Sequence, residues 1–323
     1  MKDLSNKMKL KMLGLPAMED LDDFSLCTHL SKKAIWTLSR FSDNFYFEYT
    51  ISKDNGTYRT ISQPSKELKA LQAWVLRNIL DRLQSSPSCK GFEKKTTILD
   101  NALPHIGCSI VLSVDIEDFF PSITANKVYA VFYTIGYNSL VSSILTNICT
   151  HKKTLPQGSP CSPKLSNLIC IRKDNRIQGY VGKRGITYTR YADDMAFSGL
   201  SPQKVIRIIP TLTKIIADEG FNLNPNKTRV AGLARAKRVT GLIVNEKEAG
   251  IGAQKFKTLR AKIHHLTYEK EKNNIELLNE VRGWLAFLNS VDKKQFNRAK
   301  KYIVELKGLP IHKSRLIQNL VLE

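Results

Sequence analysis

The chain has 323 residues and carries 50 lysines and arginines against 29 aspartates and glutamates, a formal net charge of +21. This length suffices for two or three subdomains around more than one apolar core. More than half of the charge surplus lies in residues 226–323, where 21 basic residues stand against 9 acidic ones. Such a surface releases counterions when it binds phosphates, so the sequence predicts a nucleic-acid partner; the alternative is a basic protein without one.

Targeting signals and cysteine motifs are missing from the sequence. No apolar run approaches the roughly 18 residues needed to cross a bilayer, and the basic N-terminus lacks an apolar signal segment. We therefore expect a cytoplasmic protein with no membrane partner. The six cysteines form no C-x-x-C pair and no cluster with zinc spacing, which predicts reduced thiols, most of them buried.

The predicted elements are mixed in the first 250 residues and helical afterwards. Strands are predicted at 45–51, 109–116, 185–192, 195–199 and 237–244, with a weaker one at 221–230. Helices are predicted at 68–83, 164–180 and 202–220, the last kinked or split at Pro210. Beyond Gly252 the expected packing face of the helical tail consists of Trp284, Leu285, Phe287 and Leu288.

Two adjacent aspartates, Asp193 and Asp194, interrupt a strand-like stretch that reads "TRYADDMAFSG". Neighbouring strand residues point to opposite faces, so both carboxylates can share one target only at the tip of a hairpin. Their repulsion is relieved by a hard cation such as Mg²⁺, which favours carboxylates together with substrate phosphates. The alternative is an exposed acidic turn, because aspartate favours turns in any protein.

A third carboxylate is predicted at the end of a buried strand. Residues 110–114 are almost wholly apolar, and Asp115 follows them directly. A carboxylate in that place is costly unless it is paired or holds a metal. Glu117 shares its face by the period of two and Asp118 points the other way, so spacing alone leaves the choice among the three open, as well as a structural role for Asp115.

Ordered motifs along the chain resemble those of reverse transcriptases. "VDIEDFFPS", "LPQGSPCSPKLSN", "TRYADD", "GFNLNPNKT" and "KRVTGLIV" follow one another like the palm motifs, and "TYRTISQPSKELKALQ" ahead of them resembles the fingers motif. The resemblance covers roughly residues 45–245. "NALPH" at 101–105 and "VTG" at 239–241 resemble signatures of bacterial retron reverse transcriptases in particular.

This resemblance implies an α+β, right-hand polymerase fold. Residues 1–44 are expected to form an N-terminal helical extension. Residues 45–240 would be the fingers and palm, with an antiparallel palm sheet bearing the YADD hairpin. Residues 241–323 would be a helical, basic thumb that binds RNA. No segment resembles an RNase H domain, so a host RNase H is expected to act separately.

By the same resemblance, Asp115, Asp193 and Asp194 are the catalytic residues and the ligands of two Mg²⁺ ions, with Mn²⁺ as the alternative ion. Phe120 matches the steric gate under the incoming sugar, with an ordinary core phenylalanine as the alternative; Phe119 is the other candidate for that core place, because adjacent strand residues face opposite ways. The other residues expected to bind the nucleotide are Arg59, Lys69, Gln157, Gly158 and Lys227. The residues expected to bind nucleic acid are Asn101, His105, Val239, Thr240, Gly241, Lys255, Arg260 and Lys262, and Tyr268, Trp284 and Tyr302 are candidates for stacking on RNA or for helix core.

The implied function is that of a bacterial retron polymerase. It would bind a cognate noncoding RNA as template and primer, start from an RNA 2′-hydroxyl, and use dNTPs to make branched single-stranded msDNA. Retrons are antiphage systems, so an effector protein is an expected partner. The alternatives are a group II intron-like or diversity-generating reverse transcriptase that uses a 3′-hydroxyl primer, and a catalytically inactive RNA-binding scaffold.

Overall fold

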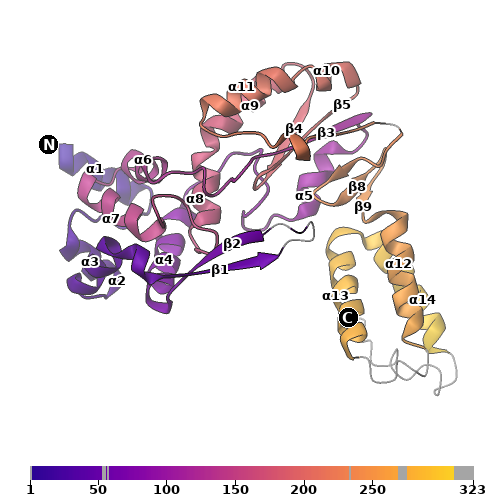
Figure 1. Cartoon of the computed structure of the whole chain (residues 1–323), viewed down its shortest axis with the longest axis horizontal. Helices are drawn as coiled ribbons and strands as arrows, with labels where there is room; N and C mark the ends of the chain where they lie inside the picture. Colours follow the sequence, from indigo (N-terminus) through magenta and orange to yellow (C-terminus); the bar gives the residue numbers. More distant parts are fainter. Residues whose placement is uncertain (1, 53–55, 57, 233, 268–274, 309–323) are drawn as a thin grey trace. The chain divides into compact units, whose positions relative to one another are not determined.

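The computed structural model describes residues 2–52, 56, 58–232, 234–267 and 275–308 (Figure 1). The chain divides into two compact units, each assembled from three stretches of sequence. Unit 1 comprises Met1–Lys95, Val114–Met195 and Arg207–Thr228, and unit 2 comprises Thr96–Ser113, Ala196–Ile206 and Arg229–Glu323. Both combine helices with antiparallel strands, which confirms the α+β class. The expected boundaries at 44/45 and 240/241 stay predictions.

Unit 1 is mostly helical. Its α-helices are α1 (Lys2–Met12), α2 (Leu21–Thr28), α3 (Lys32–Arg40), α4 (Lys66–Asn78), α6 (Ala125–Ile135), α7 (Ser139–Cys149), α8 (Ser162–Ile169), α9 (Ile171–Gly182) and α11 (Ile209–Asp218). Short 3₁₀ helices are η1 (Ser42–Phe45), η2 (Leu80–Arg82) and η4 (Pro225–Lys227). Strands β1 (Tyr46–Ser52) and β2 (Tyr58–Pro64) pair antiparallel as a hairpin, and β4 (Thr187–Tyr191) belongs to a larger sheet.

Unit 2 contains short strands and a group of longer helices. Its elements are α5 (Ile98–Ala102), η3 (Leu103–His105), α10 (Pro202–Ile206), β6 (Arg229–Ala231), β7 (Arg238–Val239), β8 (Leu242–Val244), β9 (Ala249–Gly250), α12 (Gly252–His265), α13 (Ile275–Val291) and α14 (Lys293–Lys307). Helices α12, α13 and α14 pack against one another (Figure 1). Leu285 and Leu288 are buried in their core, and Trp284 and Phe287 pack half-buried against it, as the predicted face requires.

The sequence pattern predicts α4 closely at its start. The Leu68 backbone N–H donates to the Ser65 hydroxyl (3.3 Å), which caps the first turn. Leu68, Leu71, Val75 and Ile79 on the predicted face are all buried, while Leu83 is half-buried. The helix ends at Asn78, and the rest of the predicted span continues as the 3₁₀ helix η2.

Two predicted helices are divided in the structure. The split at Pro210 is confirmed: α10 ends at Ile206, and Pro210 lies in the first turn of α11, where its missing N–H has no helical partner to lose. The helix predicted at 164–180 is instead two helices, α8 and α9, which meet at Cys170.

A four-stranded sheet has the strand order β4-β5-β3-β6. Strands β3 (Ile110–Asp115) and β5 (Asp194–Gly199) each contribute residues to both units. Ile110, Val111, Leu112 and Val114 are at most 2 % exposed, so the predicted buried central strand is confirmed. Residues 221–230 extend only into the short strand β6, and 237–244 form two strands instead of one, β7 and β8.

Two further expectations concern cysteines and membranes. All six cysteines are free, and all but Cys27 are buried, as expected for reduced, apolar thiols. Among the helices that the structure describes, none combines the length and the apolarity needed to span a bilayer.

Candidate active site

Asp193 and Asp194 lie at the tip of the β4–β5 hairpin. Strand β4 ends at Tyr191, Ala192 and Asp193 form the turn, and Asp194 is the first residue of β5. Ala192 adopts a left-handed conformation with φ 58°, which reverses the chain within two residues. The chain thus runs strand, turn, strand through "YADD", and the antiparallel palm sheet that would bear this hairpin stays a prediction.

Asp115, at the end of β3, lies beside this turn. The backbone N–H of Ile116 donates to the carbonyl of Asp193 (3.1 Å), and the N–H of Asn224 donates to the carbonyl of Asp115 (2.8 Å). Glu117 is exposed, whereas Asp115 is half-buried and its charge raises the pKa of both turn aspartates. The structure thus brings Asp115 to the pair, a choice that spacing left open.

The electrostatics of this cluster favour added positive charge. Burial and the Asp115 carboxylate raise the pKa of Asp193. Burial and the charges of Asp115 and Asp193 raise the pKa of Asp194 to about 6. The Lys227 ammonium donates to Asp115 Oδ2 (2.7 Å), and this bond raises the pKa of Lys227. One lysine therefore offsets part of the repulsion.

The donor set fits a hard divalent cation. Within the described residues no three His, Cys, Asp or Glu side chains converge as a finished metal site. A cation of the Mg²⁺ type does not need such a site, because it binds through one or two carboxylates and completes its shell with water and substrate phosphates. Asp193 and Asp194, whose pKa is raised by burial and by neighbouring carboxylate charge, are suitable donors for it.

Phe119 and Phe120 lie in the turn that follows β3 and not on a strand, so strand alternation does not separate them; their ring centroids lie 5.4 Å apart, but their other neighbours differ. Phe119 is 4 % exposed and packs on Phe221, with ring centroids 6.1 Å apart. Phe120 is half-buried, and its ring lies 6.3 Å from that of Phe92. Phe119 is therefore the core residue of the two, and the steric gate at Phe120 stays a prediction.

Arg59 and Lys69, expected to hold the triphosphate, are both exposed. The positive charge of Arg59, on β2, lowers the pKa of Asp193, so the guanidinium lies within electrostatic reach of the site. Lys69, on α4, is not among the leading causes of the pKa shifts of Asp193 and Asp194. The structure supports a place near the site for Arg59 more directly than for Lys69.

Gln157 and Gly158 lie against strand β2. The Ser62 N–H donates to the Gln157 carbonyl (2.8 Å). A Cβ atom on Gly158, where φ is 136°, would lie 2.5 Å from the Ser62 carbonyl oxygen. The resemblance predicted that the backbone at Gly158 lies close to nucleotide and template. In the structure this backbone lies close to β2.

The "NALPH" and "VTG" segments meet inside unit 2. Asn101 is 1 % exposed and its Nδ2 donates to Thr240 Oγ1 (3.0 Å). His105 is fully buried, its Nδ1 lies 2.6 Å from Ser198 Oγ, and burial lowers its pKa to about 4. Because both side chains are buried, the structure favours a structural role for Asn101 and His105, in closing the local fold, over the predicted contact with RNA.

Val239, Thr240 and Gly241 form a tight turn. Val239 is buried and pairs with Leu242, while Thr240 and Gly241 have φ 47° and 81°. A two-residue hairpin of this kind requires positive φ at both central positions, which explains the glycine. Thr240 is half-buried and Gly241 is exposed.

The basic residues predicted on the thumb lie on α12. Lys255 and Arg260 are exposed; the Lys255 ammonium reaches the Gly241 carbonyl (3.4 Å), and the Arg260 guanidinium lies 4.8 Å from the Tyr302 ring centre. Lys262 forms an ion pair with Glu280, so part of its charge is neutralised. Tyr268 lies outside the described residues.

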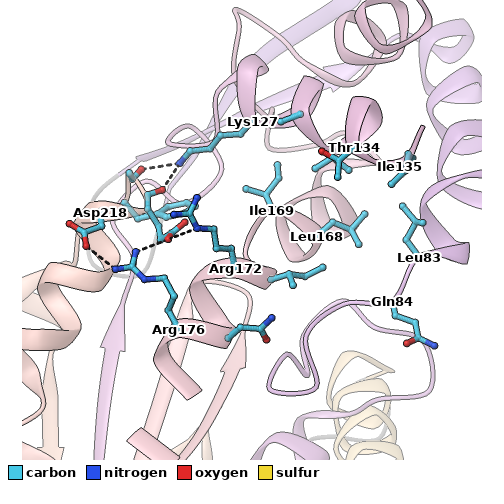
Figure 2. A pocket seen from close by; sticks show the side chains of 17 residues that line it. Leu83, Gln84, Lys127, Thr134, Ile135, Leu168, Ile169, Arg172, Arg176 and Asp218 are labelled. Atoms are coloured by element: carbon cyan, nitrogen blue, oxygen red, sulfur yellow. Dashed lines mark hydrogen bonds and ion pairs between the residues drawn. The ribbon is translucent and has the colours of Figure 1, made fainter. Parts of the chain in front are cut away.

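A hollow of about 1080 Å³ in unit 1, which the sequence did not indicate, lies between α6, α8, α9 and the end of α11 (Figure 2). Its lining is largely apolar, including Leu168 and Ile169. At its edge Arg176 binds Asp218 (2.8 Å) and Glu219 (2.7 Å). None of the described residues that line it belongs to the predicted site.

Comparisons with known proteins agree with the geometry. The reverse transcriptase (RNA-dependent DNA polymerase) family matches residues 51–278. The chain is 50% identical over 303 residues to the retron Ec86 reverse transcriptase of Escherichia coli, covering 93% of each protein. It is 30% identical over 318 residues to the retron Mx65 reverse transcriptase of Myxococcus xanthus, covering 91% of this chain and 74% of that protein. The chain therefore belongs to the bacterial retron-type reverse transcriptases and is an RNA-directed DNA polymerase.

Proposed function

We propose that this polymerase copies part of a cognate structured noncoding RNA into branched single-stranded msDNA, primed from an RNA 2′-hydroxyl. The observation that supports it most is the cluster of Asp115, Asp193 and Asp194, in a chain that matches a retron reverse transcriptase along 93% of its length. An inactive scaffold would have no use for two turn carboxylates whose pKa is raised by burial and by the charge of Asp115.

In this proposal Asp115 and Asp193 hold two Mg²⁺ ions and Asp194 completes the acidic site. The bound ions supply two effects: they make the primer hydroxyl a better nucleophile and neutralise the leaving pyrophosphate. The chain's own residues place the reactants. Phe120 limits the space at the 2′ position of the sugar, Arg59 binds triphosphate oxygens through its fork, and Lys227 supplies positive charge near the departing group.

The proposed RNA partner follows from charge and from the similarity to retron reverse transcriptases. The net surplus of residues 226–323 suits an RNA phosphate backbone. We include in the proposal a host RNase H that acts separately, an effector protein, and a role in antiphage defence. Each of these parts can fail without affecting the polymerase assignment.

The test is expression of the gene with its upstream flanking DNA in a bacterium, followed by analysis of small nucleic acids. Wild-type protein should yield a short DNA that stays joined to RNA until a debranching enzyme is added. Asp115→Ala and the double variant Asp193→Ala with Asp194→Ala should abolish this product. Glu117→Ala, an exposed acid two residues from Asp115, should retain it.

Three other outcomes are informative. If no branched product forms but purified protein extends an ordinary 3′-hydroxyl primer on RNA, the retron part fails and the polymerase remains. If the aspartate variants still make DNA, the site assignment is wrong. If wild type and variants alike only bind RNA, the chain is a scaffold.

A further inference from the structure

A fully buried arginine stands three residues before Asp193. Arg190 lies on β4 and is 0 % exposed. By the period of two it shares a strand face with Tyr188, which is also buried. A guanidinium in such a place is strongly destabilising unless its donors are paired, so its partners indicate its purpose.

Two of the three Arg190 side-chain nitrogens bind Asp174 on α9. Nε lies 3.0 Å from both carboxylate oxygens and Nη2 lies 2.8 Å from Oδ2. The Tyr188 hydroxyl also donates to Asp174, at 2.9 Å. Burial raises the pKa of Asp174, but the charges of Lys173 and Arg190 outweigh this and lower it, so the pair stays ionised. The result is a rigid fork between β4 and α9.

The remaining arm of Arg190 reaches the turn. Nη1 donates to the Ala192 carbonyl (3.0 Å) and to Asn167 Oδ1 (3.1 Å). Ala192 has φ 58°, a conformation that a residue with a Cβ keeps only when its surroundings fix it. Its carbonyl belongs to the peptide that leads into Asp193, so Arg190 holds the last peptide before the candidate catalytic pair.

A second segment encloses the same turn. The backbones of Arg190 and residues 88–90 exchange hydrogen bonds of 2.7 and 2.8 Å. Asn167 Nδ2 donates to the Gly91 carbonyl (2.8 Å), and a Cβ on Gly91 would lie 2.7 Å from the Ala192 nitrogen. The Ala192 peptide thus lies between the arginine network and a closely packed backbone.

We propose that Arg190, anchored by Asp174, is a positioning residue: it fixes the Ala192–Asp193 peptide and thereby places the two turn carboxylates before metal and substrate arrive. This inference rests on the proposed role of Asp193 and Asp194. It assigns to Arg190 no contact with substrate.

Three variants separate positioning from packing. Arg190→Met combined with Asp174→Leu removes both charges and keeps the volume, but it leaves the buried Lys173 ammonium, which lies 3.6 Å from Asp174 Oδ1, without this partner, so a second variant is needed beside it. Arg190→Lys keeps the ion pair with Asp174 but lacks the forked arm that reaches Ala192. Ile177→Ala is the control: Ile177 is fully buried on α9, so its truncation loosens the same helix without touching the turn.

The readouts are amide hydrogen exchange of residues 191–195, binding of Mn²⁺ alone measured by electron paramagnetic resonance, and steady-state primer extension on RNA. Both Arg190 variants should exchange faster in this segment and bind Mn²⁺ about tenfold more weakly. Their kcat should fall roughly 10- to 100-fold, with the KM for dNTP within about twofold of wild type. Ile177→Ala should lower the melting temperature yet leave exchange at the turn and Mn²⁺ binding unchanged.

Wild-type exchange and Mn²⁺ binding in the Arg190 variants would overturn the inference, and so would equal changes in Ile177→Ala. If the double variant does not fold, Arg190→Lys decides by the same readouts. Failure of the proposed function is recognised separately, because Asp193→Ala would then retain full kcat whatever Arg190 does to the turn.

Discussion

The Lys227 ammonium lies 2.7 Å from the Asp115 Oδ2 oxygen, so a lysine of the chain neutralises one of the carboxylates proposed to hold a metal. The pair joins η4 to the end of β3, and Asp115 contributes the more buried partner, 15 % exposed against 53 % for Lys227. A divalent cation bound to Asp115 would therefore compete with this ammonium for the same oxygen.

We predict that Lys227→Met tightens the binding of Mn²⁺ to the substrate-free protein. The gain should be at most about fivefold, because the lysine is half-exposed and such ion pairs are weak. A titration followed by electron paramagnetic resonance measures it, with Lys69→Met, an exposed lysine on α4, as the control. Unchanged or weaker binding would show that Lys227 does not compete with the ion.

Substitution of Phe119 should mainly affect stability, whereas substitution of Phe120 should mainly affect the selectivity for deoxyribonucleotides over ribonucleotides. Phe119→Ala should lower the free energy of unfolding by about 3 kcal/mol, because Phe119 is buried against Phe221. Phe120→Ala should be less destabilising and should raise incorporation of ribonucleotides relative to deoxyribonucleotides. Denaturant unfolding and single-nucleotide extension with both substrate types measure the two effects. Greater ribonucleotide use in Phe119→Ala than in Phe120→Ala would contradict the assignment.

The single substitution Gly158→Ala should strongly destabilise the folded protein. Its Cβ would lie 2.5 Å from the Ser62 carbonyl at a φ that side chains rarely adopt, so we expect a loss of about 3 kcal/mol. Gly179→Ala, in the exposed middle of α9 with open space around it, should instead stabilise by about 0.5–1 kcal/mol. Urea unfolding of both variants is the measurement, and a neutral Gly158→Ala would exclude the close approach to β2.

His105 predicts an acid-sensitive contribution to stability. Its pKa is lowered to about 4 in the folded protein, against an ordinary value near 6.5, because burial disfavours the charged ring. The neutral ring's contribution is thus fully present above pH 6.5 and is lost as the pH falls from 6.5 towards 4, about 2 kcal/mol by pH 5.

His105→Gln should remove this slope, whereas His265→Gln, which changes an exposed histidine at the end of α12, should preserve it. Unfolding measured by circular dichroism between pH 4.5 and 7.5 makes the comparison. If His105→Gln shows the same dependence of stability on pH as the wild type, other titratable groups cause that dependence.

Local patterns predicted the parts of the fold that depend on neighbours in sequence. The buried run ending at Asp115, the hairpin at Asp193 and the break at Pro210 are of this kind. The sequence did not predict β2, because its residues mix polar and apolar types. It also did not predict why residue 158 is a glycine: the reason is the Ser62 backbone, almost a hundred residues earlier in the chain.

The support of the site depended still more on distant contacts. The bond between Asn101 and Thr240 joins residues 139 apart, and Arg190 binds a residue of α9 that no spacing rule connects with it. Buried polar pairs of this type have no period in the sequence, because each partner is chosen by the packing of two elements and not by the pattern of one.

The interleaving of the two units constrains how the protein can be made. Residues 96–113 belong to unit 2 but leave the ribosome before the last two stretches of unit 1, and their partners in unit 2 follow at 196–206 and from residue 229 onward. In the folded protein, Val111 and Ala102 belong to the same core as helices α12–α14. During translation both residues lack these neighbours until more than a hundred further residues have been synthesised. A nascent chain halted near residue 228 would contain all stretches of unit 1 and an exposed apolar remnant of unit 2. A ribosome pause or a premature stop there would therefore leave an aggregation-prone chain and not a smaller working enzyme.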